Sequence, residues 1–97
     1  MKTMIVHHDA EIELWHTIEY YESKKSGLGL DFEKEFRNAL YTIQNAPNRW
    51  PEKKYGTRCF LLKRFPFAIY YIDIKDTIWI VACSHTRRRP YYWRKRI

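Results

Sequence analysis

Apolar residues repeat at helical spacing in two stretches of the first half of the chain. The two stripes are Leu14, Ile18 and Tyr21, and Phe32, Phe36, Leu40 and Ile43. This spacing puts the apolar side chains on one face of a helix. We expect the first helix to be N-capped by Asp9 and to end near Lys25, with Gly27 closing it. The second should start near Asp31 and stop before Pro47, and the short link predicts an antiparallel helical hairpin.

In the second half the pattern changes to short apolar runs that are bounded by turn residues. Strands are predicted over residues 58–63, 67–74 and 77–84, with a hairpin turn at residues 73–76. Another short strand is predicted at the N-terminus, over residues 2–8. The order of elements predicts an α+β fold, in which the helical hairpin packs on one face of a twisted antiparallel sheet (β-α-α-β-β-β).

Composition indicates a folded chain, because 45% of its 97 residues are hydrophobic and 18% are aromatic. We expect a single domain over residues 1–97. No apolar run approaches the roughly 20 residues of a membrane helix, and no signal peptide is visible, so a cytoplasmic location without membrane contact is expected. Cys59 and Cys83 lie in apolar runs and are predicted to be buried, reduced thiols. The Cys and His spacings predict neither a metal site nor a cofactor.

The positive charge is concentrated in the second half of the chain. Residues 1–48 hold five Lys/Arg against eight Asp/Glu, a net charge of −3, whereas residues 49–97 hold thirteen against three, a net charge of +10. The second half therefore faces the partner if that partner is anionic, such as a nucleic acid or an acidic protein segment.

The most basic stretch also carries large aromatic rings. Residues 87–93 read Arg-Arg-Arg-Pro-Tyr-Tyr-Trp, and Arg-Lys-Arg follows at residues 94–96. A guanidinium group suits phosphate or carboxylate, and an exposed ring suits an unstacked base or an apolar side chain of a partner. The alternatives are a solubilising basic tail and, on the strands, ordinary solvated charges. The predicted target-binding residues are Arg58, Arg64, Arg87, Arg88, Arg89, Tyr92 and Trp93.

His85 follows a strand that reads as buried, and it has two interpretations. It titrates near neutral pH, which suits a general acid–base group. The other reading, which we favour, is a structural histidine that bonds the nearby loop.

Several segments together carry a resemblance to a known family. They are Glu19-Tyr20-Tyr21-Glu22, Gly27-Leu28-Gly29-Leu30-Asp31-Phe32, Ala46-Pro47, Trp50-Pro51, Arg64-Phe65-Pro66-Phe67-Ala68-Ile69-Tyr70-Tyr71, and His85-Thr86-Arg87-Arg88-Arg89-Pro90-Tyr91-Tyr92-Trp93. The chain resembles the RelE/ParE superfamily of toxins from bacterial type II toxin–antitoxin modules. The resemblance covers nearly the whole chain and keeps the order of elements.

The resemblance implies a partner and two possible modes of action. In this family a cognate antitoxin, usually encoded beside the toxin, wraps and neutralises it. RelE-like members cut mRNA on the ribosome, whereas ParE-like members, which include plasmid-stabilisation proteins, poison DNA gyrase.

Three positions decide between the two modes. RNA cleavage without a metal needs a base, an acid and cations around the phosphate. The nuclease branch typically has an arginine where this chain has Ala68, and lysines where it has Cys59 and Leu61. We therefore favour a ParE-like toxin that inhibits growth by binding a cellular target, DNA gyrase.

Two alternatives remain open. The first is a RelE-like, metal-independent and ribosome-dependent endoribonuclease, because Arg87 and either Tyr91 or Tyr92 match the C-terminal residues of that branch. Its candidate catalytic residues are His85, Arg87, Tyr91 and Tyr92. The second is a non-toxic nucleic-acid-binding or scaffold domain.

Overall fold

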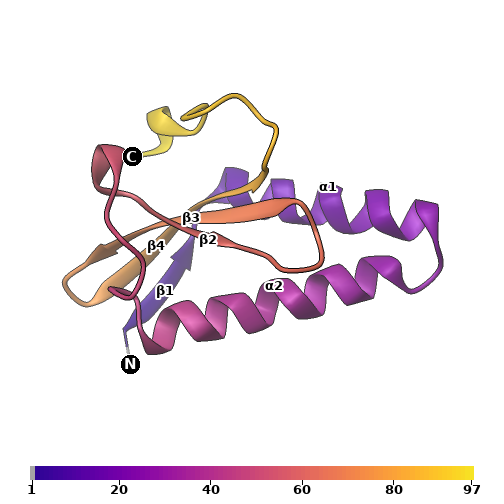
Figure 1. Ribbon diagram of the computed structural model, residues 1–97, viewed down its shortest axis with the longest axis horizontal. Coiled ribbons are helices and arrows are strands. Elements are labelled where there is room, and N and C mark those ends of the chain that lie inside the picture. The colour runs from indigo at the N-terminus through magenta and orange to yellow at the C-terminus, as the bar shows by residue number, and fades with distance from the viewer. Residues whose placement is uncertain (1) are drawn as a thin grey trace.

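A four-stranded sheet and a helical hairpin form the structure, a computed structural model that describes residues 2–97 (Figure 1). The elements are β1 (Thr3–Val6), α1 (His8–Lys24), α2 (Leu28–Asn45), β2 (Arg58–Leu61), β3 (Phe67–Ile74) and β4 (Thr77–His85), with 3₁₀ turns at Lys54–Gly56 and Arg94–Arg96. This order confirms the predicted α+β fold.

The sheet is mixed, whereas an antiparallel sheet was expected. Its strand order is β1-β4-β3-β2, in which β1 runs parallel to β4 and the other two pairs are antiparallel. A parallel pair needs a long connection, and here the helical hairpin and two strands separate its members. Within residues 2–97, no helix is both long and apolar enough to span a membrane.

Helix α2 begins at Leu28, earlier than the expected start near Asp31. A Cβ atom at Gly29 would lie 2.6 Å from the carbonyl oxygen of Ile18, so only glycine lets the first turn of α2 approach α1 this closely. The carboxylate of Glu22 also accepts hydrogen bonds from the Gly27 and Gly29 N–H groups, at 3.0 and 3.1 Å. These contacts turn the expected connector at residues 28–30 into helix.

The N-cap of α1 is His7, and the expectation of Asp9 was wrong. The Nδ1 atom of His7 accepts a hydrogen bond from the Asp9 N–H group at 3.0 Å. An imidazole nitrogen thus takes the capping role that a carboxylate was expected to fill. Asp9 lies instead in the first turn of the helix, where its negative charge interacts favourably with the helix dipole.

The main core lies between the helical hairpin and one face of the sheet. Its buried residues are Phe32, Phe36, Ala39, Ile43, Leu62, Phe65, Ile69, Tyr71, Ile78, Ile80 and Cys83. The predicted stripe of α2 supplies Phe32, Phe36 and Ile43, and Leu14, Ile18 and Tyr21 of α1 pack beside them. The periodicity of both helices therefore predicted the face that each one buries.

The second face of the sheet is covered by the C-terminal segment, residues 86–97. Figure 1 shows this segment, in yellow, on the side of the sheet opposite α2. Val81, Ala82 and Trp93 form a separate buried cluster there, with Trp79 and Tyr70 packed against it. The sequence predicted helices on one face of the sheet but did not predict this second layer.

A β-bulge at Val81 changes which residues of β4 face each layer. Tyr71 pairs with Ile80 and Tyr70 pairs with Ala82, so Val81 has no partner on β3. Consecutive residues Val81 and Ala82 consequently lie in the same cluster, and Cys83 returns to the helix side.

The hydroxyl group of buried Tyr71 makes the fold sensitive to alkali. It donates a hydrogen bond of 2.7 Å to the Pro47 carbonyl oxygen. Burial raises the pKa of Tyr71 to about 12, although the charge of Arg58 opposes the shift. The unfolded chain releases this proton near the ordinary pKa of 10. Stability that depends on the protonated hydroxyl is therefore complete below pH 10 and is lost as the pH rises toward 12, by about 1.4 kcal/mol per unit.

We predict that Tyr71→Phe lowers the free energy of unfolding at neutral pH by about 1–3 kcal/mol, because the Pro47 carbonyl loses its donor. The same variant should lose less stability than the wild type between neutral pH and pH 12, as measured by urea unfolding. Tyr41→Phe is the control, since Tyr41 is 63% exposed and should leave both results unchanged. An alkaline loss in Tyr71→Phe as steep as in the wild type would contradict this account.

Candidate functional site

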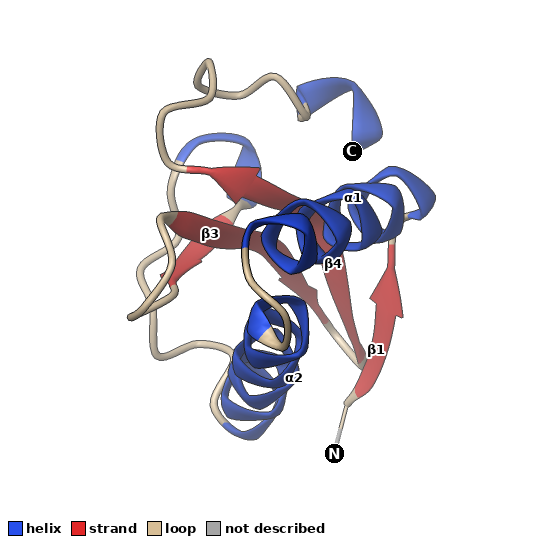
Figure 2. Cartoon of the chain, turned by 90° about the vertical axis from the view of Figure 1, so that its right-hand side faces the viewer, coloured by secondary structure: helices blue, strands red, loops and turns tan. Residues whose placement is uncertain are grey.

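The Glu13 carboxylate on α1 holds the C-terminal segment in place. It accepts hydrogen bonds from Arg96 Nη1 and Nη2, at 3.0 and 2.9 Å, and from the Tyr92 hydroxyl at 2.6 Å. It also accepts a hydrogen bond of 3.0 Å from the backbone N–H of Cys83, which lies on β4 beyond the residues that pair with β1. Figure 2 shows the C-terminal turn beside α1. One acidic side chain thus joins α1, β4 and the C-terminal segment.

Two guanidinium groups lie close to the ring of Tyr92. The Cζ atoms of Arg88 and Arg96 are 3.9 and 5.2 Å from the centre of its ring, an arrangement that favours cation–π attraction. Burial, followed by the hydrogen bond to Glu13, raises the pKa of Tyr92 well above its ordinary value. The hydroxyl therefore stays protonated at neutral pH and acts as a donor that fixes the ring.

The three consecutive arginines after β4 differ in their surroundings. Arg87, Arg88 and Arg89 are all exposed. Arg88 is turned back toward the fold, because its Nη1 atom lies 3.7 Å from Glu13. Arg87 and Arg89 have no ion pair within residues 2–97. They are the strongest candidates for direct contact with an anionic partner.

Trp93 is not available for such contact, and this corrects its prediction as a target-binding residue. Its side chain is only 1% exposed and packs 4.9 Å, centre to centre, from the ring of Tyr70. The face of the sheet opposite the helical hairpin is apolar. Burying the indole of Trp93 against it therefore stabilises the fold more than leaving the indole exposed to solvent would. Trp93 supports the C-terminal segment from below.

The two arginines predicted on or near β2 are both partly engaged by the fold. Arg58 donates to the Trp50 carbonyl oxygen at 2.5 Å and is 3.7 Å from Glu52, which fastens the preceding loop. Arg64 is 61% exposed at its side chain and lies 3.6 Å from Asp31. Arg64 therefore remains open to a partner, whereas Arg58 has a structural role.

The three neutral positions that separate the two family modes lie on one surface. Ala68 pairs with Leu61 on one side and Ser84 on the other, and Cys59 pairs with Tyr70. Ala68 is 2% exposed and Leu61 is 63% exposed, so apolar groups occupy this part of the sheet.

Tyr70 and Cys59 do not supply the charges that RNA cleavage needs. Burial, followed by the neighbouring Cys59, raises the pKa of Tyr70 to about 12. The pKa of Cys59 is also raised, mainly by burial. Both groups consequently remain neutral and protonated at physiological pH.

The four candidate catalytic residues are divided between the two faces of the sheet. The bulge at Val81 turns His85 to the helix side, where its ring packs 5.1 Å from that of Phe67. Tyr91 and Tyr92 pack in the cluster on the opposite face. His85 also accepts a hydrogen bond from the Arg87 N–H group through Nδ1, at 3.0 Å, so the loop-bonding role expected for it is observed.

Tyr91 and Tyr55 are held in an unusual backbone conformation. Their φ angles are 58° and 63°, in the left-handed region that bulky residues rarely adopt. Their rings meet edge to face at 5.4 Å, and the Lys54 ammonium lies 5.3 Å from the Tyr91 ring. Packing of the C-terminal segment on the loop before β2 therefore maintains this strain.

Sequence reasoning missed Glu13. It lies 83 residues from Arg96 and 79 from Tyr92, and at its own position it looks like any acidic residue of an amphipathic helix. The excess of acids in the first half of the chain was the only signal. Cys59 and Cys83 are free thiols, and no cluster of metal-ligating side chains occurs among the described residues.

Comparison with solved structures identifies a similar fold. One solved chain, described as "Chromosomal ParDE TA system from P. aeruginosa", aligns with 88% of this chain and 96% of its own length, with a TM-score of 0.75 and 19% sequence identity. The RelE/ParE resemblance drawn from the sequence is thus confirmed for the fold. Neither a protein-family model nor a curated protein matches the sequence.

We predict that Glu13→Gln lowers the free energy of unfolding by about 2–4 kcal/mol, because it leaves a largely buried guanidinium group with only the more distant Asp9 carboxylate, 3.8 Å from Arg96 Nε, as a counter-charge. The side chains of Glu13 and Arg96 are 13% and 14% exposed, so water screens this pair little. Urea unfolding measures the loss. Glu19→Gln, at an exposed acid in the middle of the same helix, should change stability by less than about 0.5 kcal/mol. Equal stability of the two variants would show that the network does not hold the fold.

Proposed function

We propose that this protein is the toxin of a bacterial type II toxin–antitoxin module, that it is ParE-like, and that a cognate antitoxin neutralises it in the cytoplasm. The observation that best supports this is the extent of the shared fold, which covers 88% of this chain and 96% of the solved one. The helices and strands follow one another in the order expected from the RelE/ParE resemblance, although residues 28–30 are helical instead of a connector. Fold alone does not give a mode of action, so the site must supply it.

The surface chemistry favours binding over RNA cleavage. Cleavage requires groups that abstract a proton, donate a proton and neutralise the phosphorane within reach of one phosphate. Here Ala68, Leu61 and Cys59 offer no charge, and His85 lies on the other side of the sheet. Arg87 alone of the expected nuclease groups remains exposed and charged. We therefore propose a toxin that acts by occupying its target.

The proposed target surface is the arginine loop after β4. Arg87 and Arg89 are exposed, while Arg88, Tyr92 and Glu13 fix the backbone beneath them. A backbone that is already fixed loses little conformational freedom on binding, and arginine is typical of interface hot spots. The RelE/ParE resemblance leads us to propose DNA gyrase as the target.

A groove beside α2 is the proposed antitoxin site. Trp50, Phe60 and Ala39 contribute its apolar surface, and Arg49 and Lys63 lie among its charged lining residues, around a cavity of about 520 Å³. An acidic, amphipathic antitoxin segment fits this combination, because its apolar side chains would enter the groove and its carboxylates would meet the cations.

Expression in a bacterial host tests the proposal. Growth should stop with mRNA intact and with chromosome breaks, and co-expression of the small protein encoded beside this chain should restore growth. Arg87→Ala should weaken target binding about thirtyfold or more, the loss typical of a central hot spot, and so relieve the growth arrest.

Arg37→Ala is the matched control, since Arg37 is an exposed arginine on α2, away from the arginine loop, and should leave toxicity unchanged. Thermal melts must show that Arg87→Ala stays folded. Robust codon-specific cleavage of mRNA would contradict the proposal and favour the endoribonuclease. Normal growth of the wild-type strain would favour a non-toxic binding domain.

A further inference from the structure

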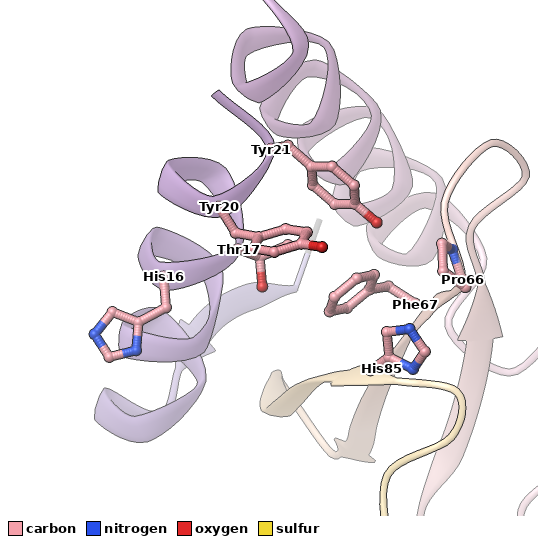
Figure 3. Close-up of a pocket in the computed structure, with 7 residues that line it drawn as sticks. All are labelled: His16, Thr17, Tyr20, Tyr21, Pro66, Phe67 and His85. Atoms are coloured by element: carbon pink, nitrogen blue, oxygen red, sulfur yellow. The ribbon is translucent and has the colours of Figure 1, made fainter. Parts of the chain in front are cut away.

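An aromatic cavity lies on the helix side of the sheet, away from the C-terminal segment's packing face. It has a volume of about 460 Å³, within the roughly 300–1,000 Å³ usual for ligand sites. Figure 3 shows its lining residues, of which His16 points away from the others. The remaining lining residues come from α1, from the start of β3 and from the end of β4: Thr17, Tyr20, Tyr21, Pro66, Phe67 and His85.

The rings around this cavity stand edge to face. Tyr20 and Tyr21 meet at 5.4 Å, Tyr21 and Phe67 at 6.2 Å, and Phe67 and His85 at 5.1 Å, with interplanar angles of 69–75°. Tyr20 is 56% exposed, so its ring is not needed to fill the core. An exposed aromatic ring at the mouth of such a cavity is a platform on which a flat ring can stack.

Polar groups accompany the rings. Because His85 Nδ1 accepts the Arg87 N–H, the neutral imidazole carries its proton on Nε2, which is left to donate to a ligand. The hydroxyl groups of Tyr20 and Tyr21 both point toward the interior of the cluster in Figure 3. A planar ligand with hydrogen-bonding edges therefore suits this cavity better than a purely aliphatic one.

One cation is placed beside the aromatic platform of this cavity. The Lys24 ammonium lies 5.1 Å from the centre of the Tyr20 ring. Arg64, by contrast, lines the groove assigned to the antitoxin and pairs with Asp31 at 3.6 Å. A single cation beside an exposed ring suits one base and the phosphate next to it.

We propose that this cavity binds one unstacked base of a single-stranded nucleic acid, which stacks on Tyr20 while a neighbouring phosphate meets Lys24. The proposal is independent of the toxin function, because the cavity shares no lining residue with the groove assigned to the antitoxin and does not include Arg87 or Arg89. A base has the flat faces and polar edges that the cavity accepts, and its backbone supplies the negative charge that Lys24 attracts.

Binding of a short fluorescein-labelled oligothymidylate, followed by fluorescence anisotropy, tests the proposal. Tyr20→Ala should weaken binding about tenfold without changing its salt dependence, since stacking is lost and no charge is removed. Lys24→Ala should reduce the slope of log affinity against log salt by about one. Tyr41→Ala and Lys34→Ala, which alter an exposed tyrosine and an exposed lysine on α2, should match the wild type.

The His85 imidazole provides a second readout, because its NMR signals should shift on titration with the single strand. The proposal would be overturned if Tyr20→Ala bound the single strand as tightly as the wild type, or if the wild type bound a DNA duplex as tightly as the single strand. Either result would reduce the interaction to electrostatic attraction by the basic half of the chain. Absence of any binding would also overturn it and leave the cavity to an apolar side chain of a protein partner.

Discussion

The Glu13 carboxylate is the contact on which the second layer of this structure depends. The sheet has two apolar faces, and a helical hairpin covers only one of them. The other face is covered by a short, strongly basic segment whose only helical element is a 3₁₀ turn. The positive charges of this segment repel one another unless an acidic group compensates them. The Glu13 carboxylate, in the acidic half of the chain, accepts hydrogen bonds from the side chains of Arg96 and Tyr92 and from the backbone N–H of Cys83. It therefore links that segment to α1 and β4. Part of the charge asymmetry of the chain therefore serves the fold, because a carboxylate of the acidic half pairs with an arginine of the basic half.

The bulge at Val81 is the second constraint, because it decides which chemistry each face presents. It places Val81 and Ala82 together beneath Trp93 and turns His85 toward α1. The imidazole is therefore separated from the tyrosines of the C-terminal segment. This separation is the physical reason that we favour binding over RNA cleavage for this chain.

The sequence predicted the helices and strands well because their apolar spacing is local. It failed where the outcome depended on distant partners. The contact of Gly29 with α1 lets α2 begin at Leu28, earlier than its own sequence pattern predicts. The parallel pairing of β1 with β4 follows from the path of the whole chain. Trp93 looked like an exposed anchor because nothing nearby in the sequence reveals an uncovered sheet face. Of the predicted binding residues, Arg87, Arg88, Arg89 and Arg64 are exposed, whereas Arg58, Tyr92 and Trp93 are engaged by the fold.

Amide hydrogen exchange of the folded protein tests most directly whether Glu13 organises the C-terminal segment. The Cys83 N–H donates to Glu13, and the Arg94 and Arg96 N–H groups donate to the carbonyls of Tyr91 and Trp93. If the network holds, these three amides are protected in the wild type, and Glu13→Gln removes their protection while Ile69 and Ile80 in the sheet keep theirs. Free exchange of Arg94 and Arg96 in the wild type, or unchanged protection in Glu13→Gln, would contradict the account.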